Sequence, residues 1–215
     1  YQNLKEDYSF EELCKNPELA AQTALGPIND FDFDVSILFS DILFPLEALG
    51  MDLKYNPGPI FGKFINNSNY DELKTAEEAV FDLTFQSEAL KITREILPKN
   101  KSLIGFVGGP WTVASYGTGM NKGVNHKGNF KNDFIFKLLT KKIIPLLKRN
   151  IELQISSGAE IVMIFDTDAS RIENKKDFYD YSNLVYENLI KPFDRKVGFF
   201  AKHPFNYDFF IENIN

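Results

Sequence analysis

The sequence predicts an α/β fold built around a parallel β-sheet, and two observations carry that prediction. Four short β-rich runs, at residues 35–40, 103–107, 161–165 and 197–201, alternate with longer segments in which apolar residues recur at helical spacing. The chain has 215 residues, of which 44% are hydrophobic, and this is ample for one buried core. We therefore expect strand–helix units whose strands run in the same direction.

The first strand, at 35–40, ends at the carboxylate of Asp41. Apolar residues on both faces of this run are typical of a buried parallel strand, and barrels and open sheets place their chemistry at the carboxyl ends of such strands. Asp41 is therefore a candidate functional residue. The alternative is that Asp41 caps the following turn or helix, because Asp is a favoured N-cap residue. Since side chains alternate along a strand, Ile37 and Phe39 are predicted to share a face with Asp41.

The segments between the strands carry helix and turn signals. Turns with a short hairpin are expected at 54–69, where proline and glycine are followed by an asparagine-rich cluster. Helices are expected at 70–97 and 133–157 from the spacing of their apolar residues, and Gly158 stands where a C-cap glycine would. Residues 117–132, rich in glycine and asparagine, predict a mobile surface loop.

The number of strand–helix units indicates part of a larger fold. A complete TIM barrel needs eight units and about 250 residues, and this sequence has four clear units in fewer residues. The fold class is therefore predicted as an α/β TIM (β/α)8 barrel that is incomplete in this chain, with residues 1–215 forming a single domain. Because the sequence begins at Tyr1 and stops at Asn215 without an evident tail, we expect truncation at both ends.

Composition excludes several classes of protein. The net charge of −6 and a pI near 5.1 give no basic surface for nucleic acid. The one cysteine, Cys14, cannot form an internal disulfide, and with two distant histidines it makes no zinc-ligand cluster, so no metal is expected. The apolar runs are too short for a membrane span, and no signal sequence opens the chain. We therefore expect a cytoplasmic protein that binds neither membrane nor nucleic acid.

Several ordered motifs resemble the uroporphyrinogen decarboxylase family. The similarity is dense from residue 1 to Tyr116 and thinner afterwards, and several motifs in order are more specific than any one. The motifs are Ser9-Phe10-Glu11-Glu12-Leu13-Cys14-Lys15-Asn16-Pro17-Glu18-Leu19-Ala20, Phe39-Ser40-Asp41-Ile42-Leu43 with Glu47-Ala48-Leu49-Gly50-Met51, Pro57-Gly58-Pro59, and Leu103-Ile104-Gly105-Phe106-Val107-Gly108-Gly109-Pro110-Trp111-Thr112 with Tyr116.

The resemblance implies a TIM-barrel enzyme of porphyrin and haem synthesis. Members of the family remove the four acetate carboxyl groups of uroporphyrinogen III, an anionic reduced tetrapyrrole, and give coproporphyrinogen III. They need neither a metal nor an organic cofactor, and they dimerise around their active-site clefts. The resemblance therefore implies a homodimer, with uroporphyrinogen as the small-molecule partner and no cofactor.

Five residues of this chain match positions that bind substrate in the family. Asp41 matches the aspartate that accepts hydrogen bonds from the pyrrole N–H groups, and Tyr116 matches the tyrosine beside the departing acetate; these two are the expected catalytic residues. Thr167 takes the place of a substrate-binding hydroxyl, and Phe39 and Ile37 match apolar residues that pack on the tetrapyrrole. The alternatives are that Tyr116 packs in the core and that Ile37 only fills a barrel interior.

Departures from the family pattern keep other interpretations open. Asp168 and Ser170 differ from the usual residues, and an extra carboxylate would repel an anionic substrate unless its side chain turns away. Asp166 is interpreted as structural, whereas Lys202 and the histidines, His126 and His203, are given no role.

The arginine-rich motif that the family carries just before the position of Tyr1 is absent from this sequence. The chain alone is therefore expected to be nearly inactive. The alternatives are a non-catalytic protein that retains tetrapyrrole binding and a zinc- or corrinoid-linked methyltransferase of the same superfamily.

Overall fold

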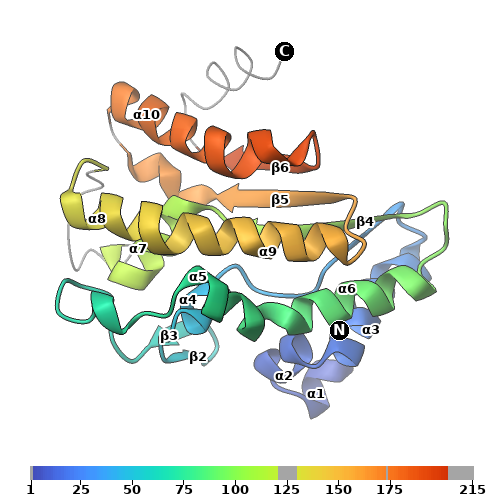
Figure 1. Ribbon diagram of the computed structural model, residues 1–215. Coiled ribbons are helices and arrows are strands. Elements are labelled where there is room, and N and C mark those ends of the chain that lie inside the picture. Colours follow the sequence, from blue (N-terminus) through green and yellow to red (C-terminus); the bar gives the residue numbers. More distant parts are fainter. Residues whose placement is uncertain (1, 121–129, 173, 203–215) are drawn as a thin grey trace.

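A four-stranded parallel sheet forms the centre of the computed structural model, which describes residues 2–120, 130–172 and 174–202 (Figure 1). The strands lie in the order β1 (Val35–Ile37), β4 (Ser102–Gly108), β5 (Ile161–Asp166) and β6 (Val197–Ala201), and each neighbouring pair is parallel. All four strands predicted from the sequence are present, so the parallel α/β prediction is confirmed.

The described α-helices precede the first strand or lie between strands, and several of them pack on the sheet. They are α1 (Leu4–Asp7), α2 (Phe10–Lys15), α3 (Pro17–Phe31), α4 (Phe44–Ala48), α5 (Ala76–Ala79), α6 (Thr84–Ile96), α7 (Pro110–Thr118), α8 (Asp133–Leu138), α9 (Ile144–Ser156) and α10 (Lys175–Val185). Short 3₁₀ turns occur at η1 (Tyr70–Glu72), η2 (Val80–Leu83), η5 (Thr167–Arg171) and η7 (Lys191–Phe193), and π-helical turns at η4 (Leu139–Ile143) and η6 (Tyr186–Ile190). None of the helices in the described residues is both long and apolar enough to cross a bilayer.

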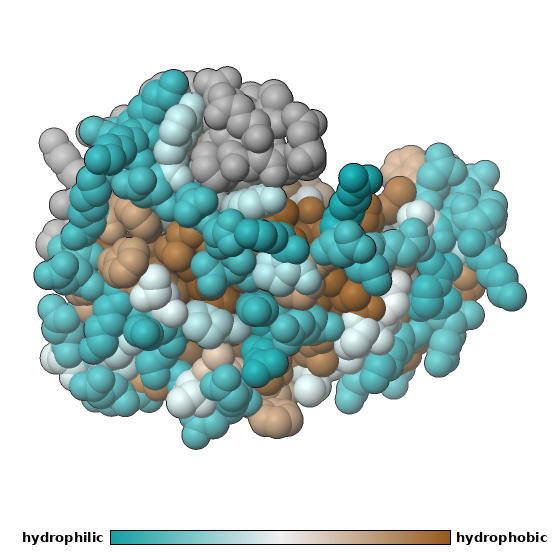
Figure 2. Space-filling view, turned by 45° about the horizontal axis from the view of Figure 1, so that its top comes forward, coloured by the Kyte–Doolittle hydropathy of each residue, from teal (hydrophilic) through white to brown (hydrophobic). Residues whose placement is uncertain are grey.

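The two faces of the sheet differ in what covers them. On one face, Leu103, Val162 and Ile164 are each fully buried, and α6 and α9 contact β4 on the outer layer. On the other face the paired residues Ile37, Ile104 and Ile161 lie in register, and Ile37 and Ile161 are 53% and 39% exposed. Figure 2 shows apolar residues gathered along the middle of one face of the molecule, with hydrophilic residues around them.

The exposure of Ile37 corrects one expectation. The first strand was predicted to be buried on both faces, yet only Ser36 and Leu38 are buried there, while Ile37 is largely exposed. The physical reason is that the described helices cover one face of the sheet only. Parallel sheets normally have both faces covered, and in a closed barrel the second face is the packed interior. The sheet therefore has the form of a barrel wall.

The segment 70–97 does not form the single helix predicted for it. It divides into η1, α5, η2 and α6. Leu73 has an extended backbone, with φ −69° and ψ 135°, and so ends the first turn. Thr75 then starts a new helix with a capping box, in which its hydroxyl accepts from the backbone N–H of Glu78 while the Glu78 carboxylate accepts from the Thr75 N–H. The apolar spacing continues across this break and hides it.

The segment 133–157 is helical throughout, as predicted, with a π-helical turn in its middle. Pro145 lies in the first turn of α9 and has no backbone N–H, so the ordinary helical hydrogen bond is missing there, and η4 precedes it directly. The helix α9 ends at Ser156 with Ser157 as its C-cap, and Gly158 follows with φ +106°, which confirms the glycine signal.

The other connecting segments were predicted in part. The expected hairpin is present as β2 (Leu53–Tyr55) and β3 (Pro59–Phe61), which pair antiparallel. Of the predicted mobile loop, Gly117 and Thr118 complete α7 instead, and residues 121–129 lie outside the described part of the chain.

Candidate functional site

Three of the predicted site residues follow neighbouring strands. Asp41 comes after β1, Tyr116 lies on α7 after β4, and Thr167 begins η5 after β5. Because these strands are parallel neighbours, their carboxyl ends form one edge of the sheet, and the three residues lie along it. Among the described residues no direct hydrogen bond joins these three side chains. They are brought to one edge without forming a closed cluster.

Asp41 is half-buried and shapes the turn that follows its strand. Its Oδ1 accepts the backbone N–H of Leu43 at 2.7 Å, which is the geometry of an Asx turn. The helix α4 begins one residue later, and Leu43, at its N-cap, provides no side-chain cap. The turn-forming alternative is thus part of the structure. One carboxylate oxygen is used locally, and the other is left for a second donor.

The surroundings of Asp41 favour the protonated form of its carboxyl group. Burial raises the pKa of the Asp41 carboxyl above its usual value, against the opposing effects of the Leu43 N–H and of the Tyr55 hydroxyl. Burial and the nearby Asp41 charge also raise the pKa of Cys14 to about 12, so that thiol stays neutral. A working carboxylate here requires donors that favour its charged form.

Aromatic rings enclose the Asp41 side of the edge. Phe10 on α2 packs against Phe39 at 6.0 Å between ring centroids and against Tyr55 at 4.9 Å. Phe44, the first residue of α4, lies 6.0 Å from Tyr55. Phe39 and Asp41 are both half-buried, whereas Ile37 is largely exposed. The carboxylate therefore stands beside a largely apolar wall.

Tyr116 and Thr167 differ in exposure. The ring of Tyr116 is half-buried and packs against the core, so the structure includes the core packing that was weighed against substrate contact. Its helix starts with Pro110 and closes at Gly119, whose φ of +76° is the left-handed conformation that glycine adopts easily. Thr167 is exposed at the start of η5.

Asp166 ties the ends of β4 and β5 together. Its fully buried Oδ1 accepts both the backbone N–H and the hydroxyl of Thr112 at 2.8 Å, and its other oxygen accepts the hydroxyl of Tyr181. The Tyr181 hydroxyl oxygen in turn accepts a hydrogen bond from the backbone N–H of Trp111 at 2.9 Å. Burial raises the pKa of Asp166 to about 6, opposed by these hydrogen bonds. This agrees with the interpretation of Asp166 as structural.

Gly109 is required by this arrangement. A Cβ atom at Gly109 would lie 2.2 Å from the Asp166 side chain, a distance that no side chain can tolerate. The glycine lets the turn after β4 approach the end of β5 and sets the start of α7, which carries Tyr116.

The carboxylate of Asp168 is turned toward α7. It accepts the Ser115 hydroxyl at 2.6 Å and lies 3.4 Å from the Arg171 guanidinium, and the Asp168 N–H donates to Thr112. A carboxylate at this position was expected to repel an anionic substrate unless its side chain turned away. Its contacts with the Ser115 hydroxyl and the Arg171 guanidinium partly offset the charge. The partner Arg171, three residues on, was the available signal and was missed.

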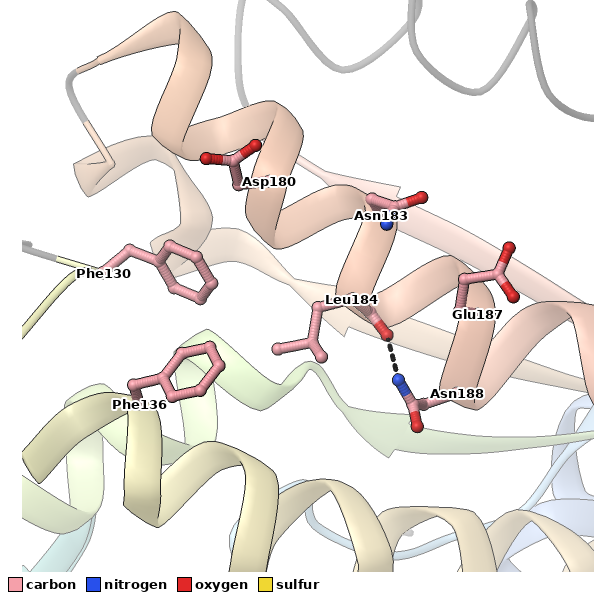
Figure 3. A pocket seen from close by; sticks show the side chains of 7 residues that line it. All are labelled: Phe130, Phe136, Asp180, Asn183, Leu184, Glu187 and Asn188. Atoms are coloured by element: carbon pink, nitrogen blue, oxygen red, sulfur yellow. Dashed lines mark hydrogen bonds between the residues drawn. The ribbon is translucent and has the colours of Figure 1, made fainter. Parts of the chain in front are cut away.

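Ile37 and Phe39 line a groove of about 920 Å³ at the edge of the sheet. The groove runs between β1 and α3, where Pro27 and Phe31 form its other side. A second hollow, of about 420 Å³, lies between α8 and α10, where Phe130 and Phe136 face Leu184 (Figure 3). No predicted site residue lines this second hollow.

The remaining sequence candidates are Lys202 and the two histidines. Lys202 follows β6 and is exposed, whereas His126 and His203 lie outside the described residues. Across the described ranges, no group of three His, Cys, Asp or Glu side chains is placed to hold a metal ion.

Comparison with known proteins identifies the relatives of this chain. The family model for uroporphyrinogen decarboxylase (URO-D) matches residues 1–209. Proteins named uroporphyrinogen decarboxylase are 38% identical over 186 residues in Aliarcobacter butzleri, 39% over 197 in Campylobacter jejuni and 41% over 182 in Nitratiruptor. These matches cover 82%, 87% and 80% of this chain but 54%, 57% and 52% of the relatives. The chain thus spans about half the length of the curated relatives it matches.

A solved structure gives the fold independently. A methyltransferase from Methanosarcina mazei superposes with a TM-score of 0.68 over 81% of this chain and 54% of that protein, at 19% identity. At this identity the likeness concerns the fold alone, which is the TIM-barrel fold. The barrel prediction is confirmed.

Proposed function

Because the chain belongs to the uroporphyrinogen decarboxylase family, we propose that the protein removes the acetate carboxyl groups of uroporphyrinogen III to give coproporphyrinogen III. The observation that carries the proposal is the half-buried carboxylate of Asp41 at the carboxyl end of β1, within a match that runs over residues 1–209. The expected setting is haem synthesis in the cytoplasm, by a homodimer without a cofactor.

The reaction needs a sink for electrons. A proton first adds to a pyrrole ring carbon, and the bond between the acetate methylene and its carboxylate then breaks. Carbon dioxide leaves, and the bonding pair moves into the cationic ring. The exocyclic carbon takes up a proton to become a methyl group, and the ring carbon releases the proton it gained. The ring carries its positive charge before the bond breaks, so stabilising that cation lowers the barrier.

Asp41 is the residue proposed to stabilise the cation. Its ionised carboxylate would accept the pyrrole N–H groups and oppose the ring's positive charge. A fixed charge beside an apolar wall interacts more strongly than the same charge in water. Pyrrole N–H donors would also favour the ionised form of Asp41, which burial alone disfavours.

The other matched residues are proposed to hold the substrate. The Tyr116 hydroxyl would donate to the acetate that is lost, and the Thr167 hydroxyl to another substrate group. Phe39 would pack on the tetrapyrrole beside Asp41, with Ile37 further along the same face. The exposure of Ile37 in this structure leaves its surface available to an apolar ring.

The test is the substitution Asp41→Asn in the full-length gene product. It keeps the shape of the side chain and removes its charge, so turnover of uroporphyrinogen III should fall about 100-fold or more. The matched control is Asp52→Asn, at an exposed aspartate of the β2–β3 hairpin, which should retain wild-type turnover. Turnover near wild type in Asp41→Asn would remove the basis of the proposal.

The alternative of a non-catalytic binding protein makes a different prediction. It rests on the departures at Asp168 and Ser170, and the Asp168 contacts with Ser115 and Arg171 weaken it. If it holds, the full-length gene product binds uroporphyrin, measured by fluorescence, but releases no carbon dioxide from uroporphyrinogen. The 215-residue chain alone is expected to be nearly inactive under either interpretation. Zinc bound at one ion per chain would instead favour the methyltransferase alternative.

A further inference from the structure

Tyr55, the last residue of β2, reaches the Asp41 cluster from the hairpin. Its ring lies between Phe10 of α2 and Phe44 of α4, with centroids 4.9 and 6.0 Å away. Its hydroxyl is buried and makes no hydrogen bond of ordinary geometry within the described residues. A buried hydroxyl without a partner destabilises a fold, so its presence here calls for a physical reason.

The charged neighbour of that hydroxyl is Asp41. The two groups act on each other, because Tyr55 lowers the pKa of Asp41 while the Asp41 charge adds to the burial that raises the pKa of Tyr55. The phenol therefore stays protonated and can only be the donor toward an ionised carboxylate. Leu43 occupies Oδ1 of Asp41 at 2.7 Å, which leaves the other oxygen for a second donor.

We propose that Tyr55 is a positioning residue that donates its hydroxyl proton to the Asp41 carboxylate, holding that carboxylate ionised and aimed at the substrate. The proposal rests on the proposed function and adds to it how the chain keeps a half-buried acid charged. Hydrogen bonds at active sites are often long before substrate binds and tighten afterwards, which accounts for the loose geometry here.

The other titratable groups of the cluster do not supply this donor. Cys14 on α2 is neutral and buried. Glu47 on α4 accepts from Lys15 at 2.6 Å, and Glu11 lies 4.0 Å from the same ammonium. Lys15 is thus engaged by Glu47, and its ammonium also lies 5.5 Å from the Phe44 ring centroid. Tyr55 remains as the side-chain donor that faces Asp41.

The consequence is a defined pH effect. A donor to the charged form of an acid lowers its pKa, so removing the Tyr55 hydroxyl should raise the pKa of Asp41. In the proposed mechanism Asp41 must be ionised, so the acid limb of the pH–rate profile should move to higher pH in Tyr55→Phe. A residue that only packs would lower activity by a similar factor at every pH.

The direct experiment is a carboxyl ¹³C NMR titration of the 215-residue chain. Asp41→Asn identifies the Asp41 signal by its loss. Tyr55→Phe should raise the apparent pKa of Asp41 by about half a unit to one unit, a three- to tenfold change in its ionisation constant. The matched control is Tyr70→Phe, a buried tyrosine of η1 whose ring packs against Phe134, and it should leave Asp41 unchanged. An unshifted Asp41 signal in Tyr55→Phe overturns the proposal.

A second variant covers the case in which Tyr55→Phe disturbs the hairpin. Incorporation of 3-fluorotyrosine at position 55 keeps the ring and makes the phenol a stronger donor. The pKa of Asp41 should then fall below its wild-type value, and a rise or no change contradicts the proposal. The NMR readout does not depend on turnover. If Tyr55→Phe shifts the pKa of Asp41 but Asp41→Asn keeps full turnover, the proposed function fails and the Tyr55 contact stands. If Asp41→Asn loses turnover but Tyr55→Phe leaves the pKa of Asp41 unchanged, only the role of Tyr55 fails.

Discussion

Asp41 and Asp166, at the ends of two strands of the same sheet, both have their pKa raised by burial but serve different purposes. Asp166 is fully buried and satisfied by Thr112 and Tyr181, so it fixes the geometry of the edge. Asp41 is half-buried with one recorded backbone donor, Leu43, so it retains capacity for a ligand. A satisfied carboxylate is typical of structure, and an under-satisfied carboxylate of function.

Asp166 should make stability depend on pH. Its folded pKa of about 6 lies above the value of about 3.9 in an unfolded chain, so its contribution is fully present below pH 4. That contribution is lost as pH rises through about 6, and the change is about 2 to 3 kcal/mol. Asparagine does not titrate, so the unfolding free energy of wild type relative to Asp166→Asn should decrease between pH 4 and 6.5. Urea unfolding at several pH values measures it, and a pH-independent difference contradicts it.

Replacing Asp166 with a residue that has no acceptor should lower the unfolding free energy more than Asp166→Asn does. In Asp166→Ala the Thr112 N–H and the Tyr181 hydroxyl lose their acceptor in the interior, and we expect a loss of about 3 kcal/mol or more in unfolding free energy. Asp82→Ala, at an exposed aspartate whose carboxylate pairs with Lys74, is the control and should cost about 1 kcal/mol or less. Equal losses in chemical denaturation would argue against the Asp166 network.

At the scale of elements, a new helix begins after Thr75, and the apolar spacing of the chain gave no sign of it. The capping box of Thr75 and Glu78 begins α5, so Thr75→Ala should cost about 1 kcal/mol of unfolding free energy. Thr84→Ala is the control, because the Thr84 hydroxyl only donates to the Phe81 carbonyl oxygen in an exposed turn. Denaturant midpoints measure both, and a loss no larger than that of the control would show that the cap is not needed.

The strands and helix ends that were predicted correctly are those whose signals lie in neighbouring residues of the sequence. Each strand of the parallel sheet is a short run made mostly of apolar residues, and Gly158 marks a helix end through its own backbone conformation. The break at Thr75 was missed because periodicity reports which side of a helix is apolar and not whether the helix is continuous. The π-helical turn before Pro145 was likewise invisible to apolar spacing.

The site was predicted in its placement but not in its interactions. Asp41, Tyr116 and Thr167 follow strands, and strand ends of a parallel sheet meet at one edge whatever lies between them. The contact of Asp166 with Thr112 spans 54 residues, and no spacing rule connects them. The sequence gives no sign of the proposed Tyr55–Asp41 contact for the same reason, since a hairpin residue has no fixed position relative to a strand end.

At the scale of the whole molecule, the two faces of the sheet should respond differently to the same polar change. Val162 is fully buried under the helices, whereas its neighbour Ile161 is 39% exposed. In the 215-residue chain, Val162→Thr should cost about 1 to 3 kcal/mol of unfolding free energy, because it buries a hydroxyl. Ile161→Thr should cost about 1 kcal/mol or less. Thermal unfolding with a calorimeter compares them, and equal costs would mean that both faces are covered in solution.

Within the described residues, the outer strand β1 pairs with another strand on one side only, through β4. No described strand pairs with the other side of β1, and such a border can template the growth of further extended polypeptide. Concentrated samples of this chain should therefore form fibrils sooner than a closed barrel of the same composition. Dilution, or charged residues introduced along this border, should delay fibril formation.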